Sequence, residues 1–132
     1  MFQNVLFPID PSRETQDAIS IVSDIVKTYQ SQLYLLSVVE KSTDSSNIMA
    51  DEEKVAKLLD TAQNMFATEN IQAKTIEKEG MPPFVICDVA DEINANIIIM
   101  GCRGLGLTHE GSDESVTNRV INLAPCPVLV VP

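Results

Sequence analysis

The chain has 132 residues, of which 45% are hydrophobic and 21% charged, and this predicts one globular domain, residues 1–132, with a buried core. Acidic residues outnumber basic ones by 19 to 9, and the net charge of −10 argues against nucleic acid or anionic membrane as partners. Three widely spaced cysteines and a single histidine argue against a disulfide framework and against a metal site.

An apolar run followed by a helical pattern opens the chain. Residues 5–9 (VLFPI) predict a buried strand that ends at Pro8, because proline has no N–H group to donate to a sheet. A turn follows at Asp10, and Ser12 can cap the next helix. The apolar residues after it recur at helical spacing and predict one buried helix face: Ala18, Val22, Ile25, Val26 and Tyr29.

A second strand and a second helix are expected in the middle of the chain. Residues 33–39 (LYLLSVV) predict a buried strand. The polar, serine-rich residues 41–51 show no apolar period and predict a flexible loop. The following apolar residues have the spacing of an amphipathic helix: Val55, Leu58, Leu59, Ala62, Met65 and Phe66.

Two further helices and three further strands complete the pattern. Residues 71–78 mix charged with apolar residues, as expected of an edge strand protected against aggregation, and Gly80 ends it. Pro82 or Pro83 opens a third helix, in which Ile86, Val89, Ala90 and Ile93 face inward. Residues 97–100 and 128–131 predict the last two strands. Between them, a fourth helix stopped by prolines 125 and 127 buries Val116, Val120, Leu123 and Ala124.

This alternation of strands and helices predicts an α/β fold. Five strands with four intervening helices form an open, doubly wound, mostly parallel sheet that is covered on both faces. Ligands of such folds bind beyond the carboxyl ends of the strands, at the point where the strand order reverses. The sequence therefore indicates where to look for a site before any motif is considered.

A glycine-rich segment follows the fourth strand at that end of the sheet. Glycines between a strand and a helix let backbone N–H groups surround an anion, and the helix dipole adds to the attraction. Asp113 and Glu114, however, put carboxylates where a phosphate would be expected. Ser112, Ser115 and Thr117 are interpreted as helix caps. Four of the chain's five glycines lie in this segment: Gly101, Gly104, Gly106 and Gly111.

These segments together resemble the universal stress protein family over essentially the whole chain. The family's motif is Gly, two residues, Gly, nine residues, then Gly followed by Ser or Thr. Gly101, Gly104 and Ser115 match this motif, whereas Glu114 stands where it has its last glycine. The order and spacing of VLFPID, GMPPFVICDVADEINANIIIMG, MGCRGLG and APCPVLVV are also those of the family.

The resemblance implies a nucleotide alpha-hydrolase-like fold with the strand order 3-2-1-4-5 and an adenine-nucleotide crevice. The adenine would lie near Asp10 and Val38, and the ribose and phosphates along the glycine-rich loop. A homodimer would form through the last strand, residues Val128, Leu129, Val130 and Val131. The candidate nucleotide-binding residues are Pro8, Ile9, Asp10, Val38, Met100, Gly101, Arg103, Gly104, Ser115 and Val116.

Glu114 is expected to weaken this crevice. A carboxylate about 5 Å from one phosphate charge, at an effective dielectric near 20, repels it by roughly 3 kcal/mol, or about a hundredfold in affinity. Arg103 has acidic neighbours at Glu110 and Asp113 that compete with phosphate for its guanidinium group. A bound Mg²⁺ ion could offset the repulsion by bridging the carboxylate to a phosphate.

The sequence thus predicts a stress-response binding protein rather than an enzyme, with no required cofactor and no catalytic residue or metal ligand. A competent ATP-binding protein is the first alternative, and a nucleotide hydrolase is the second, although no nucleophile–base pair supports it. A redox sensor acting through Cys102 is the third. Whether ATP, AMP, a cyclic nucleotide or nothing binds stays open.

The expected location is the cytoplasm. The first residues, MFQNVLFPID, lack the basic start of a secretory signal. No apolar run in the chain approaches the roughly 20 residues needed to span a bilayer.

Overall fold

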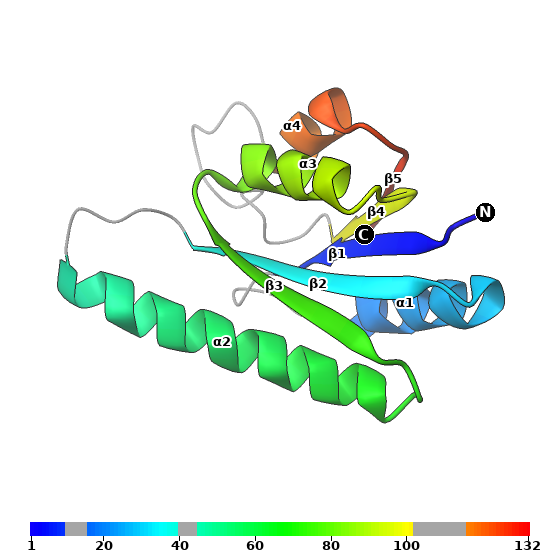
Figure 1. Ribbon diagram of the computed structural model, residues 1–132, viewed down its shortest axis with the longest axis horizontal. Coiled ribbons are helices and arrows are strands. Elements are labelled where there is room, and N and C mark those ends of the chain that lie inside the picture. Colours follow the sequence, from blue (N-terminus) through cyan, green and yellow to red (C-terminus); the bar gives the residue numbers. More distant parts are fainter. Residues whose placement is uncertain (10–15, 40–44, 102–115) are drawn as a thin grey trace.

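The computed structural model describes residues 1–9, 16–39, 45–101 and 116–132, with the backbone alone for residues 16–17 and 45–52. Within these residues, strands and helices alternate as predicted (Figure 1). In chain order the elements are β1 (Asn4–Pro8), α1 (Gln16–Tyr29), β2 (Gln32–Val39), α2 (Ser45–Ala67), β3 (Ala73–Glu79), α3 (Pro82–Glu92), β4 (Ile97–Gly101), α4 (Val116–Leu123) and β5 (Val128–Val131).

The strands form one parallel sheet in the order β3-β2-β1-β4-β5, which confirms the order implied by the resemblance. The central strand, β1, pairs with β2 on one side and with β4 on the other. The chain builds the sheet outward from β1 to β3, and then returns to place β4 and β5 on the opposite side. The strand order therefore reverses between β1 and β4.

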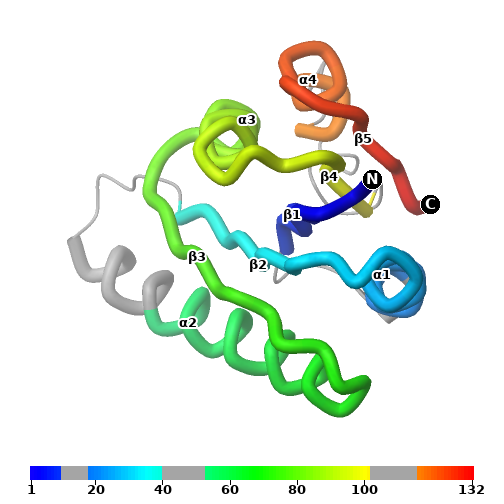
Figure 2. The backbone as a smooth tube through the Cα atoms, turned by 45° about the vertical axis from the view of Figure 1, so that its right-hand side comes forward, coloured from blue at the N-terminus to red at the C-terminus, as the bar shows by residue number. Residues whose placement is uncertain are grey.

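Helices cover both faces of the sheet (Figure 2). Because side chains alternate along a strand, Val5 and Phe7 of β1 pack into the core on the α1–α2 face, and Leu6 packs into the core on the α3–α4 face. Phe7 meets Phe66 of α2 edge to face, with ring centroids 6.1 Å apart. Among the described helices, none combines the length and the hydropathy of a membrane span.

The second helix begins earlier than its apolar pattern indicates. α2 starts at Ser45, so that residues 45–51 belong to a helix and the prediction of a flexible loop over residues 41–51 is wrong for them; residues 41–44 lie outside the described part of the chain. Residues 49–53 (MADEE) include Met, Ala and Glu, which favour helix, and adding a turn to a helix that is already packed is easier than starting one. Because the later turns of α2 already pack against the sheet, its first turns can form without an apolar stripe of their own.

Two predicted core residues are exposed instead. Tyr29 and Leu123 are 44% and 50% exposed, because each is the last residue of its helix and has little of the sheet left to cover. The Tyr29 ring meets Phe2 edge to face at 5.0 Å. Ile19 and Thr117, which the helical pattern did not assign to the core, are buried in their place.

Candidate functional site

The predicted crevice corresponds to the carboxyl ends of β1 and β4. Val5 and Leu6 of β1 pair with Ile97 and Ile98 of β4, so that Pro8 and Met100 each stand two residues beyond the last pair that joins the two strands. From this edge, the chain leads from β1 to α1 on one face of the sheet and from β4 to α4 on the other (Figures 1 and 2). This is the arrangement at which doubly wound proteins bind ligands.

The end of β1 is held firmly in place. Pro8 and Ile9 are both buried, and the Ile9 N–H group donates a hydrogen bond of 2.8 Å to the carbonyl oxygen of Leu36 in β2. The backbone is thereby anchored up to the residue before Asp10, which itself lies outside the described residues. The strand ends at Pro8, as the sequence predicted.

The end of β4 combines a buried side chain with an open backbone position. Met100 is fully buried, with its side chain in the core on the α3–α4 face. Gly101, the next residue, is half-buried, and no described atom outside its chain neighbours lies within 4 Å of the position that a β-carbon would take. Within the described part of the chain, nothing therefore blocks the approach of a ligand to the backbone at Gly101.

Two further candidate nucleotide-binding residues pack against the hydrophobic core on the α3–α4 face of the sheet. Val38 of β2 and Val116, the first residue of α4, are both half-buried, and both pack against the cluster that contains Met100. The fold thus brings candidate residues from three separate elements to one hydrophobic cluster. The other candidates on the glycine-rich loop, Arg103, Gly104 and Ser115, lie outside the described residues, as does Glu114.

Thr117 was interpreted from the sequence as a helix cap, and this interpretation is wrong. The residue lies inside α4, it is 4% exposed, and its hydroxyl group has no hydrogen-bond partner among the described residues. A buried hydroxyl without a partner costs about 1–3 kcal/mol. The one sequence signal for its burial is its spacing of three residues from Val120, on the same side of the helix.

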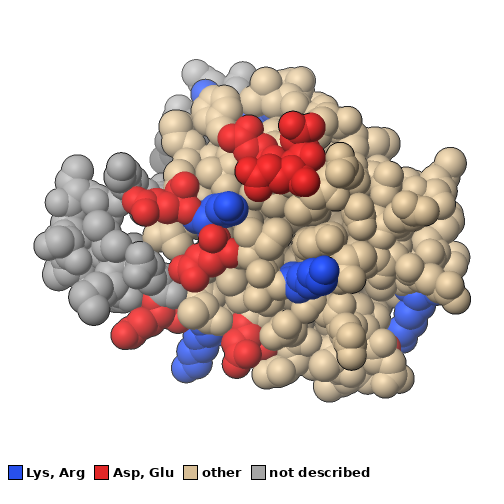
Figure 3. Space-filling model, in the orientation of Figure 1, with Lys and Arg blue, Asp and Glu red and all other residues tan. Residues whose placement is uncertain are grey.

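Acidic side chains dominate the visible surface of α3 (Figure 3). The helix carries the exposed residues Asp88, Asp91 and Glu92. Across the described part of the chain, no three His, Cys, Asp or Glu side chains come close enough to hold a metal ion. The acidic surface repels polyanions, in keeping with the net charge of the chain.

Two cysteines lie near the α3–α4 core, and both carry free thiols. Cys87 of α3 and Cys126, which follows α4, are half-buried. Burial raises the pKa of the Cys87 thiol, with a further contribution from the Asp88 carboxylate. Burial and the neighbouring Cys87 raise the pKa of the Cys126 thiol. Since the thiolate is the reactive form, neither thiol is activated as a nucleophile.

Comparison with known proteins gives a consistent result. The sequence model of the universal stress protein family matches residues 1–132. A universal stress protein of Synechocystis is 61% identical over 136 residues, an alignment that covers 100% of this chain and 87% of the relative.

Solved structures with the same fold cover nearly the whole chain. The universal stress protein UspA from Lactobacillus plantarum superposes with a TM-score of 0.86 at 27% identity, covering 99% of this chain and 98% of its own. A universal stress protein solved in complex with cAMP superposes with a TM-score of 0.82 at 18% identity, covering 99% of this chain and 97% of its own.

Proposed function

Because the chain belongs to the universal stress protein family, we propose that it is a stress-response binding protein whose crevice takes an adenine nucleotide. The crevice lies at the carboxyl ends of β1 and β4, where the strand order reverses. The observation that carries the proposal is the open backbone position at Gly101, beside the anchored end of β1. A protein of this fold in complex with cAMP supports the choice of an adenine nucleotide.

We assign the two halves of the nucleotide to different parts of the crevice. The adenine would lie near Asp10, against the backbone of Pro8 and Ile9 and the end of β2 at Val38. The ribose and phosphates would follow the loop from Gly101 to Val116, with Gly104 and Ser115 supplying backbone and hydroxyl donors. Arg103 would pair either with a phosphate or with the acids of its own loop.

Glu114 is proposed to set which nucleotide binds best. Its carboxylate stands at the position of the motif's last glycine, near the expected phosphates. Coulomb repulsion increases with the charge on the ligand, so that the triphosphate of ATP loses more than the single phosphodiester charge of cAMP. We therefore expect cAMP and AMP to bind more tightly than ATP unless Mg²⁺ screens the triphosphate.

We propose that the protein is a nucleotide-responsive regulator rather than an enzyme, that it requires no cofactor, and that it acts in the cytoplasm. Nucleotide binding would stabilise one conformation, or a homodimer formed through β5. This role needs no nucleophile or general base, only a ligand whose binding energy differs between two states.

The test is a nucleotide extraction followed by calorimetric titration. Mass spectrometry of the heat-released small molecules is expected to find little ATP, and titration is expected to give a Kd for ATP at least tenfold higher than that for cAMP. Near-stoichiometric copurified ATP would refute the weakened crevice. If no adenine nucleotide binds at millimolar concentration, the crevice itself is refuted.

The variant Gly101→Val tests whether the nucleotide binds at the proposed crevice. The β-carbon that the substitution adds has no described atom within 4 Å outside the chain neighbours of Gly101, so that the described part of the fold should tolerate it. We expect unchanged thermal stability and the loss of all nucleotide binding. Unaltered affinity in the folded variant would place the nucleotide elsewhere.

A further inference from the structure

The exposed side of α3 carries a row of side chains with an apolar end and an acidic end. Met81, the residue directly before the helix, and Phe84 are 58% and 47% exposed. Asp88, Asp91 and Glu92 follow at the other end, and all three are exposed (Figure 3). The steps of three, four and three residues from Met81 to Asp91 keep these side chains in one row, because residues three and four apart are neighbours on a helix surface. We call this row the α3 stripe.

The backbone holds the apolar end of the stripe in place. The N–H groups of Phe84 and Val85 donate hydrogen bonds of 3.1 and 3.0 Å to the carbonyl oxygen of Met81. Pro82 and Pro83, which lie between them, have φ angles fixed by their rings. The two exposed apolar side chains therefore stand on a rigid turn, so that a partner packing on them orders little additional backbone.

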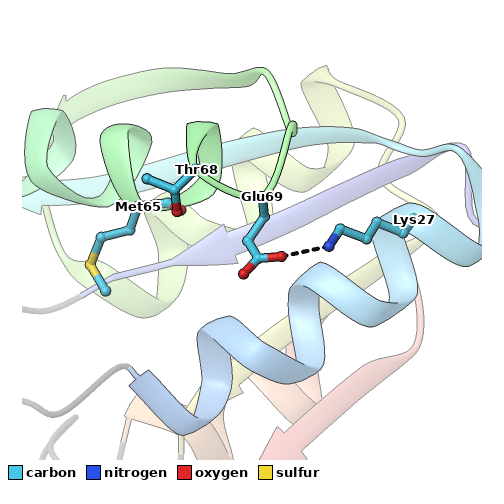
Figure 4. A network of polar contacts seen from close by, with 4 residues as sticks. All are labelled: Lys27, Met65, Thr68 and Glu69. Atoms are coloured by element: carbon cyan, nitrogen blue, oxygen red, sulfur yellow. Dashed lines mark hydrogen bonds and ion pairs between the residues drawn. The ribbon is translucent and has the colours of Figure 1, made fainter.

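The acidic end of the stripe lacks a compensating positive charge. The last turn of α3 has no basic residue, and none of the three acids pairs with a Lys or Arg side chain within the described part of the chain. The ion pair between Lys27 and Glu69, at 2.5 Å, joins α1 to the turn after α2 on the other face of the sheet (Figure 4). The carboxyl end of a helix also carries a partial negative charge, which repels carboxylates in the last turn. A positive charge from outside the chain would relieve both repulsions.

The charge of the stripe selects among its possible occupants. In a two-fold interface between copies of this chain, the acidic end would face like charges. Nucleic acid and anionic membranes would be repelled by the same carboxylates. The stripe instead fits an occupant that has apolar groups at one end and positive charges at the other.

The spacing along the stripe is that of a contact between two helices. Alternating steps of three and four residues are those of the a and d positions of a heptad, at which helices pack side by side. From Met81 to Glu92 the stripe extends about 16 Å, at a rise of about 1.5 Å per residue. A partner helix of about three turns would cover it.

From the exposed apolar pair, the unpaired acids and their heptad-like spacing, we propose that the α3 stripe docks a basic amphipathic helix of a partner protein. Large apolar side chains of the partner would pack on Met81 and Phe84, and its Lys or Arg side chains would lie at the acidic end. An antiparallel arrangement would bring the positive amino end of the partner's helix dipole to that end. The apolar contact would supply most of the affinity, and the charges would set the orientation and the choice of partner.

The test uses two synthetic, alanine-based helical peptides that contain the same leucines and lysines, and it follows amide chemical shifts of the full chain. In the matched peptide, made in both sequence directions, leucines and then lysines lie in one row at steps of three and four residues. In the split peptide, the leucines lie on the side of the helix opposite the lysines. We expect the matched peptide to shift the amides of residues 81–92 saturably and to bind at least tenfold more tightly than the split peptide. Equal affinities, or no binding of the matched peptide at millimolar concentration, would overturn the proposal.

Two matched pairs of variants separate the stripe from general attraction to an acidic protein. Phe84→Ser should weaken binding of the matched peptide about tenfold, whereas Ile21→Ser, at a 37% exposed position of α1 on the other face of the sheet, should leave the affinity within twofold. Asp91→Asn should weaken binding several-fold, whereas Asp60→Asn makes the same change of charge at an exposed position of α2 and should leave the affinity within twofold. Equal losses within either pair would overturn the stripe as the docking site.

Two further measurements test other occupants of the apolar end. Binding to uncharged phosphatidylcholine vesicles that is lost in Phe84→Ser would assign this end to a lipid surface. Self-association that is lost in Phe84→Ser, as measured by sedimentation velocity, would assign it to a second copy of the chain. We expect neither result, and either one would overturn the proposal. cAMP binding should be unchanged in all four variants, which keeps this test separate from that of the nucleotide crevice.

Discussion

The charge and the volume of the Glu114 side chain have separable effects on the proposed crevice. Glu114→Gly restores the last glycine of the family motif and removes both, so ATP binding should tighten by up to about a hundredfold if the full repulsion of roughly 3 kcal/mol is relieved. Isothermal titration calorimetry at fixed ionic strength measures this gain. The gain should shrink at high salt, because exposed charges are screened.

Glu114→Gln serves as the matched variant, since it keeps the volume of the side chain and loses the charge. A gain in both variants would assign the obstacle to electrostatics, and a gain in the glycine variant alone would assign it to steric hindrance of the backbone. If ATP affinity stays the same or falls in both, Glu114 is not the obstacle. The weakened-crevice proposal would then have to be abandoned.

Single buried hydroxyl groups are where sequence reasoning was least informative. Ser23 and Thr117 are both buried without a partner among the described residues, yet serine and threonine occur as readily on helix surfaces and at caps. Helical spacing predicts the apolar face of a helix. It does not predict which of the small polar residues that border this face are buried by neighbouring elements. The burial of these two residues follows from the tertiary packing alone.

At the scale of elements, the turn between β3 and α3 depends on a glycine. Gly80 has φ of +148°, and its N–H group donates a 2.9 Å hydrogen bond to Val39. A β-carbon at this position would lie 2.7 Å from Cγ2 of Val85, whose branched side chain has little rotamer freedom. Gly80→Ala should therefore lower the free energy of unfolding by about 1–3 kcal/mol, as measured by urea denaturation.

The double variant Gly80→Ala with Val85→Ala separates the two causes of this loss. Compared with Val85→Ala alone, the glycine change should then cost less, because the steric contact is gone and only the backbone strain remains. Wild-type stability for Gly80→Ala would show that the turn adopts another conformation. An equal cost in both backgrounds would assign the whole loss to the backbone.

Strands and helices with a strong apolar pattern could be predicted from the sequence. Turns added to a helix by the helix propensity of their residues, without an apolar pattern, could not. The strands β1, β2, β4 and β5 were located to within a residue, because each is a nearly continuous apolar run, as is usual for parallel strands. The start of α2 was missed because its first turns follow helix propensity rather than an apolar period.

The candidate site divides in a similar way. Pro8, Ile9, Val38, Met100 and Gly101 belong to strands predicted from apolar runs or directly follow one, and their role in nucleotide binding stays a prediction. The loop residues from Arg103 to Ser115 depend on a resemblance rather than on periodicity, and their roles stay predictions.

At the scale of the whole molecule, the two edges of the sheet differ in character. β3 exposes charged residues along its length, among them Lys74, Glu77 and Glu79, which is how edge strands avoid pairing with other chains. β5 carries no charge, and its Leu129 is 36% exposed. The apolar edge therefore supports the prediction of a homodimer through Val128–Val131.

A charge placed on β5 tests this prediction. In a two-fold symmetric dimer the same surface is used twice, so Leu129→Lys introduces two like charges into one apolar interface. We expect the dimer to dissociate at least tenfold more readily, as measured by sedimentation velocity over a range of concentrations. Met81→Lys, at a 58% exposed position that follows the opposite edge strand, adds the same charge and should leave the dimer intact. A wild type that stays monomeric at high micromolar concentration would refute the dimer, and equal weakening by both lysines would assign the effect to net charge rather than to β5.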